Sequence, residues 1–419
     1  MQKQISNIKS LARRNRTIIG NFSYLSALQI LTLLVPLATY PHLIRVLGKE
    51  IYGVIVFSQA IIGYFVLLVS YGFTTSATKD VSIYRNDKLK LTEIVSSVLI
   101  IKGILLLISF ILLGIALYFI PKAHGYYMLF FLTMWLAVYD FIFPIWYFQG
   151  IEKMKYITYF TLVSRLVFLV LIFVFIKSAQ DYLLVPIINA VGAILAGVCS
   201  IYIIFKIHKV QFKFQKPIVL WKYFSESFPL FVSTVSVSVF VLANKIIIGS
   251  FIGMAEVAYY DLAEKIVQLL KSPQILITQA IFPKTSKDKN KLFIKKMMLI
   301  SIVLALFLFC LIQIFAHYIV MSLGGIRMES AVKLLRVLSI AIILIYVSQY
   351  TSVHTLLAYG YNNVWMKLMI VSGVLYLLLV TALGFLHKIT AMNLVYISLL
   401  TELYILVSSY YYSKKYKLL

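Results

Sequence analysis

The chain has 419 residues, of which 62% are hydrophobic and only 13% are charged, and its mean hydropathy is +0.95. A soluble protein keeps about a quarter of its residues charged, so the composition excludes an ordinary soluble domain and predicts a polytopic membrane protein. In such a protein the net charge of +25 is expected to mark the cytoplasmic ends of the spans and to face anionic membrane lipids, and no nucleic-acid partner is expected.

A basic segment opens the chain and leads directly into the first long apolar run, without a small-residue cleavage site. This pattern predicts a cytoplasmic anchor rather than a cleaved signal peptide. The basic residues of the segment are Lys3, Lys9, Arg13, Arg14 and Arg16.

Twelve apolar runs follow, each close to the roughly 20 residues that a helix needs to cross the hydrocarbon of a bilayer. The predicted fold is therefore an all-α bundle of twelve transmembrane helices, although the polar eighth and tenth runs leave eleven or thirteen crossings open. The predicted spans are 18–40, 51–74, 94–120, 126–148, 157–176, 182–205, 228–252, 256–283, 297–321, 331–358, 364–386 and 390–412.

The connections between these runs differ strongly in charge. With a cytoplasmic N-terminus, the cytoplasmic connections and the tail hold most of the 39 basic residues, and the outer connections hold only Arg45, Lys49, Lys122, Lys177, Arg327 and Lys388. Because Lys and Arg gather on the cytoplasmic side, both termini are predicted to be cytoplasmic. All outer connections are short, which argues against an external catalytic domain within this chain.

The longest cytoplasmic connection falls at the midpoint of the chain and divides it into two sets of six spans. The predicted domains are an N-terminal lobe (1–205), an inter-lobe loop (206–227) and a C-terminal lobe (228–419). A weak echo between "VLGKEIYGVIVFSQAI" (46–61) and "FIGMAEVAYYDLAEKI" (251–266) suggests a duplication. Two pseudo-symmetric bundles would enclose a central cavity, which is a transporter's architecture.

Charged residues inside the predicted spans are candidates for function, because each costs about 2.5–3.5 kcal/mol at the centre of a bilayer. The basic ones are Lys102, Arg165, Lys245, Lys265, Lys271, Lys333 and Arg336. Lys333 lies near the end of its span, so we expect its long side chain to snorkel, that is, to reach the membrane interface. Snorkelling also stays open as the explanation for Lys102, Arg165, Lys245 and Arg336. The excess of cations over acids otherwise predicts an anionic ligand.

The eighth span carries its polar residues on one face of a helix. That stripe comprises Asp261, Glu264, Lys265, Gln268, Lys271 and Ser272. Pairing within the stripe would explain it structurally, through spacings of three and four residues. We favour a stripe that lines an aqueous path, because a purely structural solution would be apolar.

Four intramembrane acids are candidates for coupling transport to a cation: Asp140, Asp261, Glu264 and Glu402. A desolvated carboxyl group can take up a proton during a transport cycle. The alternative for Asp140 and for Glu402 is a structural pair with an intramembrane Lys or Arg. His354 is expected to be a hydrogen-bonded core residue. No catalytic, nucleotide-binding, metal-binding or disulfide pattern is present, so no catalytic residue, metal or cofactor is predicted.

Two regions carry a specific resemblance to a known family. They are "NFSYLSALQILTLLVPLATYPHLIRVLGKEIYGVIVFSQA" (21–60) with "YGFTTSATKDVSIYR" (71–85), and "GMAEVAYYDLAEKI...ITQAIFPKTSK" (253–287). The chain resembles the polysaccharide transporter (Wzx-type, O-antigen flippase) family of the multidrug/oligosaccharidyl-lipid/polysaccharide (MOP) exporter superfamily. It lacks the two further helices typical of the related lipid II flippases.

The resemblance implies a V-shaped, alternating-access transporter of two six-helix lobes in the bacterial inner membrane. It implies a substrate of undecaprenyl-pyrophosphate-linked oligosaccharide, an O-antigen or capsule or exopolysaccharide precursor, moved from the cytoplasmic to the periplasmic leaflet. It also implies a cationic cavity, and leaves a proton or sodium ion, a polysaccharide polymerase and a chain-length regulator as further candidate partners. The family supplies no invariant ligand pattern, so the site residues rest on the charge argument.

Two other functions compete with this interpretation. A drug or metabolite exporter of the same superfamily would favour an acid-dominated cavity for organic cations, the reverse of the charge balance here. A membrane polysaccharide polymerase or glycosyltransferase would usually present a large external loop, and no outer connection is long enough. The sequence therefore predicts a transporter and not an enzyme.

Overall fold

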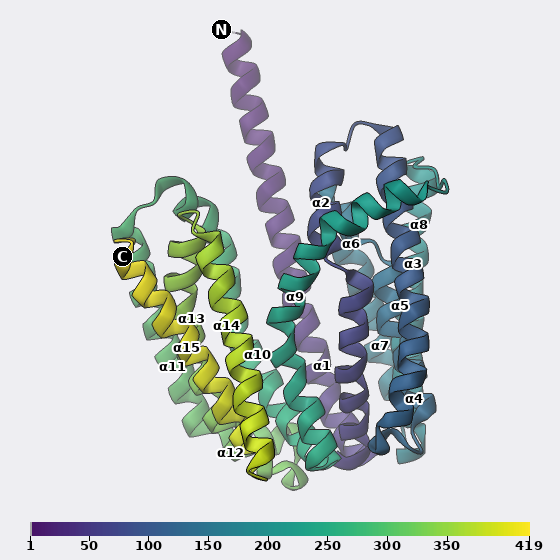
Figure 1. Cartoon of the computed structure of the whole chain (residues 1–419), viewed down its shortest axis with the longest axis vertical. Coiled ribbons are helices and arrows are strands. Elements are labelled where there is room, and N and C mark those ends of the chain that lie inside the picture. Colours follow the sequence, from purple (N-terminus) through teal and green to yellow (C-terminus); the bar gives the residue numbers. More distant parts are fainter. Residues whose placement is uncertain (1) are drawn as a thin grey trace. The chain divides into compact units, whose positions relative to one another are not determined.

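The computed structural model describes the backbone of residues 2–419, and the side chains of residue 24 and of residues 27–419 apart from those at 236, 237, 239–241 and 283. Over the described backbone the chain forms helices and no β-strand (Figure 1). This confirms the predicted all-α class. The side chains of the predicted N-terminal anchor lie outside the described residues.

The helices follow one another with short connections. In the first part of the chain they are α1 (Gln2–Ser70), α2 (Phe73–Ile83), α3 (Lys88–Phe119), η1 (Pro121–Ala123), α4 (Tyr127–Thr133), α5 (Trp135–Ile142), α6 (Ile145–Gly150), α7 (Met154–Phe175), η2 (Ala179–Leu183), α8 (Leu184–Tyr202) and η3 (Ile203–Ile207). They continue with α9 (Pro217–Phe251), α10 (Met254–Asp288), α11 (Lys291–Gly324), η4 (Ile326–Met328), α12 (Ser330–Leu338), α13 (Ile340–Thr351), η5 (Ser352–Leu357), α14 (Asn362–Phe385) and α15 (Ala391–Lys415).

Nine stretches of the described residues are long and apolar enough to cross a membrane. The first of them, Ala27–Ile83, contains the second predicted span and most of the first, and α9 and α10 coincide closely with the seventh and eighth predicted spans. The helix bounds are therefore consistent with twelve crossings.

The first predicted connection, between the spans 18–40 and 51–74, is mostly helical. Helix α1 continues through it and is interrupted only at Gly48, whose φ of 77° and ψ of 165° are not helical. Glycine tolerates this region because it has no Cβ. The sequence therefore placed a boundary near the right residue but expected a longer connection than the structure has.

The fourth predicted span, 126–148, is broken into three short helices, α4, α5 and α6. Pro144 stands between α5 and α6 and cannot continue the hydrogen-bonding pattern of a helix. Helix α5, which ends just before this break, carries Tyr139 and Asp140.

The described chain forms two compact units, which are considered separately. Unit 1 comprises Met1–Val35, Ile62–Phe175 and Leu183–Val232, and unit 2 comprises Pro36–Ile61, Ile176–Tyr182 and Ser233–Leu419. The predicted division into lobes at 1–205, 206–227 and 228–419 stays a prediction.

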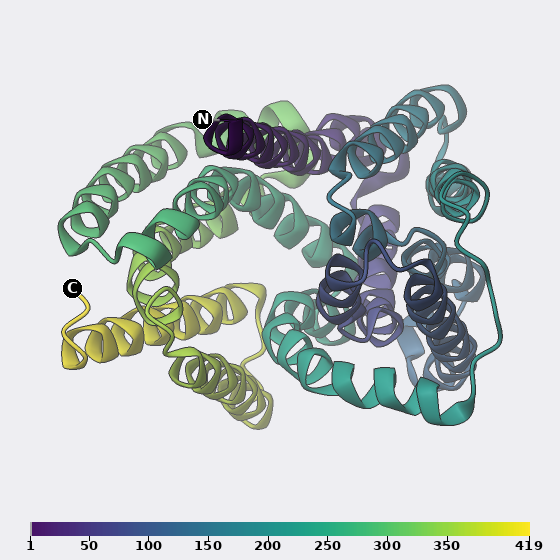
Figure 2. The same cartoon turned by 90° about the horizontal axis from the view of Figure 1, so that it is seen from above.

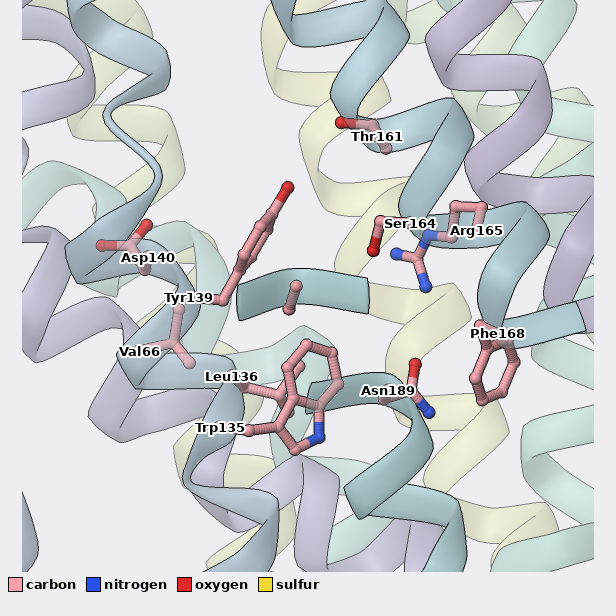
Figure 3. A pocket seen from close by; sticks show the side chains of 11 residues that line it. Val66, Trp135, Leu136, Tyr139, Asp140, Thr161, Ser164, Arg165, Phe168 and Asn189 are labelled. Atoms are coloured by element: carbon pink, nitrogen blue, oxygen red, sulfur yellow. The ribbon is translucent and has the colours of Figure 1, made fainter. Parts of the chain in front are cut away.

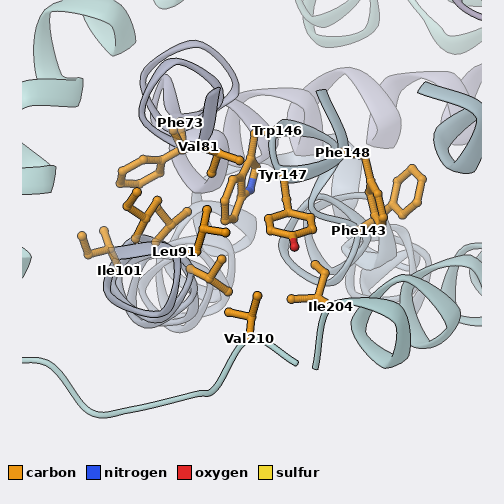
Figure 4. Packing of buried hydrophobic residues seen from close by; sticks show 14 of the residues in the cluster. Phe73, Val81, Leu91, Ile101, Phe143, Trp146, Tyr147, Phe148, Ile204 and Val210 are labelled. Atoms are coloured by element: carbon orange, nitrogen blue, oxygen red, sulfur yellow. The ribbon is translucent and has the colours of Figure 1, made fainter. Parts of the chain in front are cut away.

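The core of unit 1 is an aromatic and aliphatic cluster between α2, α3 and α6 (Figure 4). Trp146, Tyr147 and Phe148 pack there against Val81 and Leu91. The helices α2 and α6 come very close, since a Cβ on Gly150 would lie 2.6 Å from the Val81 side chain. Only glycine permits this approach, which fixes α6 and the break before it.

In unit 2, small polar residues join α15 to α13 and η5. The hydroxyls of Thr351 and Ser409 lie 2.7 Å apart, and those of Thr355 and Ser413 also lie 2.7 Å apart. Small residues let helices pack closely within a membrane, and hydroxyl pairs hold them there. The helices α14 and α15 also pack against each other, side by side in both views (Figures 1 and 2).

Candidate functional site

A cavity of about 220 Å³ lies within unit 1 (Figure 3). Its lining residues come from α1, α5, α7 and α8, and they are Val66, Trp135, Leu136, Tyr139, Asp140, Thr161, Ser164, Arg165, Phe168, Asn189 and Ala193. Ligand pockets for drug-sized molecules measure about 300–1,000 Å³. This cavity is therefore sized for one small group, such as a single sugar ring or phosphate, rather than for a whole oligosaccharide.

Arg165 reaches this cavity because it lies on the inner face of α7. The buried residues of that helix include Thr161 and Phe168, four positions before and three after Arg165, so the arginine shares their stripe. Val163, Leu166 and Val170 lie on other faces and are exposed. Among the described side chains, no carboxylate lies within ion-pair distance of Arg165. Among the described residues, the Arg165 guanidinium therefore has no acidic partner.

Polar and aromatic groups share the cavity with Arg165. The hydroxyls of Tyr139 and Thr161 belong to the lining, and the side-chain nitrogen of Asn189 donates to the carbonyl oxygen of Val185 at 3.1 Å. Trp135 and Tyr139 add two rings to the lining. An arginine fork, hydroxyls, an amide oxygen and aromatic faces together can hold an anionic or sugar-like group by charge, hydrogen bonds and stacking.

Asp140 also lines the cavity, but its charge is already paired. The Lys102 Nζ on α3 lies 2.7 Å from Asp140 Oδ2 and donates to the Asp140 backbone oxygen. Lys102 is 2% exposed. Lys102 and Arg165 lie at similar positions along their predicted spans, yet the fold pairs Lys102 with a carboxylate and, among the described residues, offers none to Arg165.

A second charged group lies in unit 2, where three elements meet. The Lys245 Nζ on α9 lies 2.9 Å from Asp261 Oδ1 and 2.7 Å from Glu264 Oε2. On α10, the Lys265 Nζ lies 2.5 Å from Asp261 Oδ2. Tyr52 donates to Asp261 Oδ2 at 2.9 Å and accepts a hydrogen bond from Lys265 at 2.6 Å. The two cations and two carboxylates thus neutralise one another in a closed network.

Among the described side chains, the remaining predicted site residues form no ion pair within 4 Å with these two groups. Lys271 is partly buried on α10 and experiences the charges of Glu402 on α15 and of Glu264 on α10. Arg336 is exposed on α12. The structure therefore brings together Lys102, Asp140 and Arg165 in unit 1, and Lys245, Asp261, Glu264 and Lys265 in unit 2. Their roles in substrate binding and ion coupling stay predictions.

Several residues of these groups were missed from the sequence. Asn189, a lone amide in an apolar span, and Ser164, next to Arg165, carried a weak signal that was not used. Trp135, Tyr139 and Tyr52 carried none, because aromatic residues are frequent throughout the spans.

His354 is buried and lies 3.0 Å from the Thr285 hydroxyl, as expected for a hydrogen-bonded core residue. In the described part of the chain, no three His, Cys, Asp or Glu side chains gather to hold a metal ion.

Residues 18–289 match the family described as "Polysaccharide biosynthesis protein". A protein named "Putative O-antigen transporter" from Escherichia coli (strain K12) is 29% identical over 378 residues, which cover 88% of this chain and 90% of that protein. A protein of the same name from Shigella dysenteriae is 27% identical over 281 residues, covering 66% of this chain and 70% of that protein.

Solved structures share the fold at low sequence identity. The inward-facing conformation of a multidrug resistance MATE family transporter of the MOP superfamily superimposes with a TM-score of 0.70 at 17% identity, covering 94% of this chain and 97% of that one. The lipid II flippase MurJ, in an inward closed conformation, gives a TM-score of 0.71 at 15% identity, covering 95% of this chain and 87% of that one. The chain therefore shares its fold with these two transporters.

Proposed function

Because the chain belongs to the polysaccharide biosynthesis protein family, we propose that it is a flippase for undecaprenyl-pyrophosphate-linked oligosaccharide. It moves the repeat unit of an O-antigen, capsule or exopolysaccharide from the cytoplasmic to the periplasmic leaflet of the bacterial inner membrane. The names of its relatives and its MOP-type fold support this proposal. The protein is a membrane transporter and not an enzyme.

One observation in the molecule carries the proposal. Arg165 lines a small cavity within the spans, and no carboxylate among the described residues neutralises it. A cation in this position costs free energy that a purely structural residue would avoid, and an anionic substrate group would compensate it. The cavity has room for one sugar or phosphate of the lipid-linked substrate at a time.

The same cavity suggests where a coupling ion acts. Asp140 contributes to its lining and holds Lys102, so protonation or sodium binding at Asp140 would release a second cation toward the cavity. This makes Asp140 the first candidate for coupling to a proton or sodium gradient. Asp261, Glu264 and Glu402 are further candidates, and the first two act within their network with Lys245 and Lys265.

A drug exporter of the same superfamily is the second candidate function. The fold alone is compatible with it, since MATE transporters share this architecture. Arg165, which has no acidic partner among the described residues, argues against it, because a cavity for organic cations favours an unpaired acid. A polysaccharide polymerase and a chain-length regulator are the partners that fit a flippase.

The proposal is tested by flipping in vesicles. We expect purified protein to move a fluorescent undecaprenyl-pyrophosphate oligosaccharide between leaflets, and Arg165→Gln to slow this movement about tenfold or more because the substrate loses its counter-charge. Arg327→Gln, which removes an exposed arginine in η4, is the matched control and should flip at the normal rate. Absence of flipping by the unaltered protein, with efficient efflux of an organic cation, would favour the exporter instead.

A further inference from the structure

A second hollow lies between α14 and α15 in unit 2, away from the charged groups described above. It has a volume of about 780 Å³. The residues that line this α14–α15 groove are Val364, Lys367, Leu368, Val371, Tyr404, Val407, Ser408, Tyr411, Tyr412, Lys415 and Tyr416. On each helix every lining residue has another three or four positions away, so each helix presents one continuous face to the groove. The two helices diverge toward the C-terminal end of α15 (Figure 1).

Both charges of the groove are positive and lie at one end of it. Lys367 belongs to the second turn of α14, and Lys415 is the last residue of α15, so the two antiparallel helices place their lysines near the same end. Both side chains are exposed, and no acidic residue lines the groove. Neither lysine forms an ion pair with a described residue. The groove therefore has one cationic end.

Tyrosines form the wall beside the lysines. Tyr412 and Tyr416 stack with centroids 6.1 Å apart, Tyr416 stacks on Tyr361 at 4.3 Å, and the Lys415 Nζ lies 6.0 Å from the centroid of Tyr412. These rings pack against the small buried cluster of Leu356, Leu368 and Leu418, which holds the wall in place. Tyr404 and Ser408 also line the groove, but they lie two to three turns before Lys415 on α15, near Val407. The cationic end is thus bordered by fixed tyrosine rings.

The other end of the groove is apolar. Val371 on α14 and Val407 on α15 are 47% and 58% exposed, so they offer an open hydrocarbon surface one to two turns deeper along the helices. A ligand that fits both ends carries a negative head and an apolar chain. Basic pockets between membrane helices at the cytoplasmic side recognise such anionic lipid headgroups.

We propose that the α14–α15 groove is a binding site for a membrane lipid with an anionic phosphate headgroup. Lys367 and Lys415 hold the phosphate, the hydroxyls of the tyrosines beside them donate hydrogen bonds to it, and an acyl or polyprenyl chain lies along Val371 and Val407. On the predicted orientation the site opens to the cytoplasmic leaflet. The site stands on the groove itself and does not require the flippase function.

The proposal is tested by lipid binding to the full-length protein in detergent, followed by native mass spectrometry and by fluorescence of a labelled phosphatidylglycerol. We expect phosphatidylglycerol to bind and phosphatidylcholine, whose headgroup is net neutral, to bind weakly. The double variant K367Q/K415Q should weaken phosphatidylglycerol binding about tenfold or more. Ser408→Phe, which fills the groove without changing charge, should weaken it as well.

The matched control is K414Q/K417Q, which removes two exposed lysines at the same end of α15 that do not line the groove. Equal weakening by both double variants, or undiminished binding by Ser408→Phe, would overturn the site and leave only general attraction to a basic surface.

Competition with undecaprenyl diphosphate shows whether the phosphate in the groove belongs to a carrier lipid or to an ordinary phospholipid. Displacement at lower concentration assigns the groove to the carrier lipid, and resistance to displacement assigns it to an ordinary phospholipid. Because binding is measured without transport, a failed flipping assay leaves this result intact.

Discussion

At the scale of single residues, the intramembrane charges divide by whether the fold gives them a partner. Lys102, Lys245 and Lys265 contact carboxylates at 2.5–2.9 Å, whereas Arg165 lines a cavity without one among the described residues. Removing one member of a buried pair leaves a charge that nothing compensates, which costs about 3–5 kcal/mol. We therefore expect the pairs to act first on stability and the arginine to be available for a ligand.

The Lys102–Asp140 pair gives a direct test of this division. Asp140→Asn leaves Lys102, whose side chain is 3% exposed, without its counter-charge and should lower the thermal unfolding midpoint in detergent. Lys102→Met should have a smaller effect, because the Asp140 side chain is 25% exposed and water reaches it. The double variant K102M/D140N removes both charges and should regain most of the lost stability. Equal losses in the two single variants and an additive loss in the double variant would contradict the pairing.

At the scale of helices, the apolar runs predicted where the chain crosses the membrane, because about 20 apolar residues are a physical requirement of the bilayer. They did not predict how a crossing is interrupted. Gly48 reduces an expected connection to one non-helical residue, and Pro144 splits an expected span. A proline in an apolar run is a readable signal for a break, whereas the tight approach of Gly150 to Val81 depends on the packed neighbour and has no signature in a single sequence.

The Gly48 kink leads to a prediction about stability. Gly48→Ala places a Cβ on a residue with φ of 77° and ψ of 165°, a conformation that essentially only glycine adopts. We expect a loss of about 1–3 kcal/mol, seen as a lower unfolding midpoint. Gly114→Ala is the control: Gly114 lies inside α3, the position that its Cβ would take has no neighbour within 4 Å, and alanine favours a helix. A Gly48→Ala protein as stable as the Gly114→Ala protein would argue against the kink.

At the scale of the whole molecule, prediction from the sequence was most informative where one physical rule governs many residues. The distribution of Lys and Arg predicts an orientation, and the intramembrane charges gave seven cationic candidates, of which Arg165 is one. The neighbours of Arg165 were not predictable, because Trp135, Tyr139 and Asn189 meet it only after α5, α7 and α8 have packed. The charged network of unit 2 was predictable only in part. Asp261 and Glu264 share a helical face in the sequence, but Lys245, which contacts both, comes from α9, and Tyr52, which donates to Asp261, comes from α1.

The orientation itself is open to measurement with single cysteines. Cys199 and Cys310 are first replaced by serine, and single cysteines are placed at the exposed positions Lys216, Lys287 and Arg327. In intact cells whose outer membrane is permeabilised, a membrane-impermeant maleimide should label Arg327→Cys and leave Lys216→Cys and Lys287→Cys unlabelled, because the basic connections stay in the cytoplasm. All three should react once the inner membrane is opened, which shows that each thiol is accessible. Labelling of position 216 or 287 in intact cells would reverse the orientation, and with it the leaflet to which the α14–α15 groove opens.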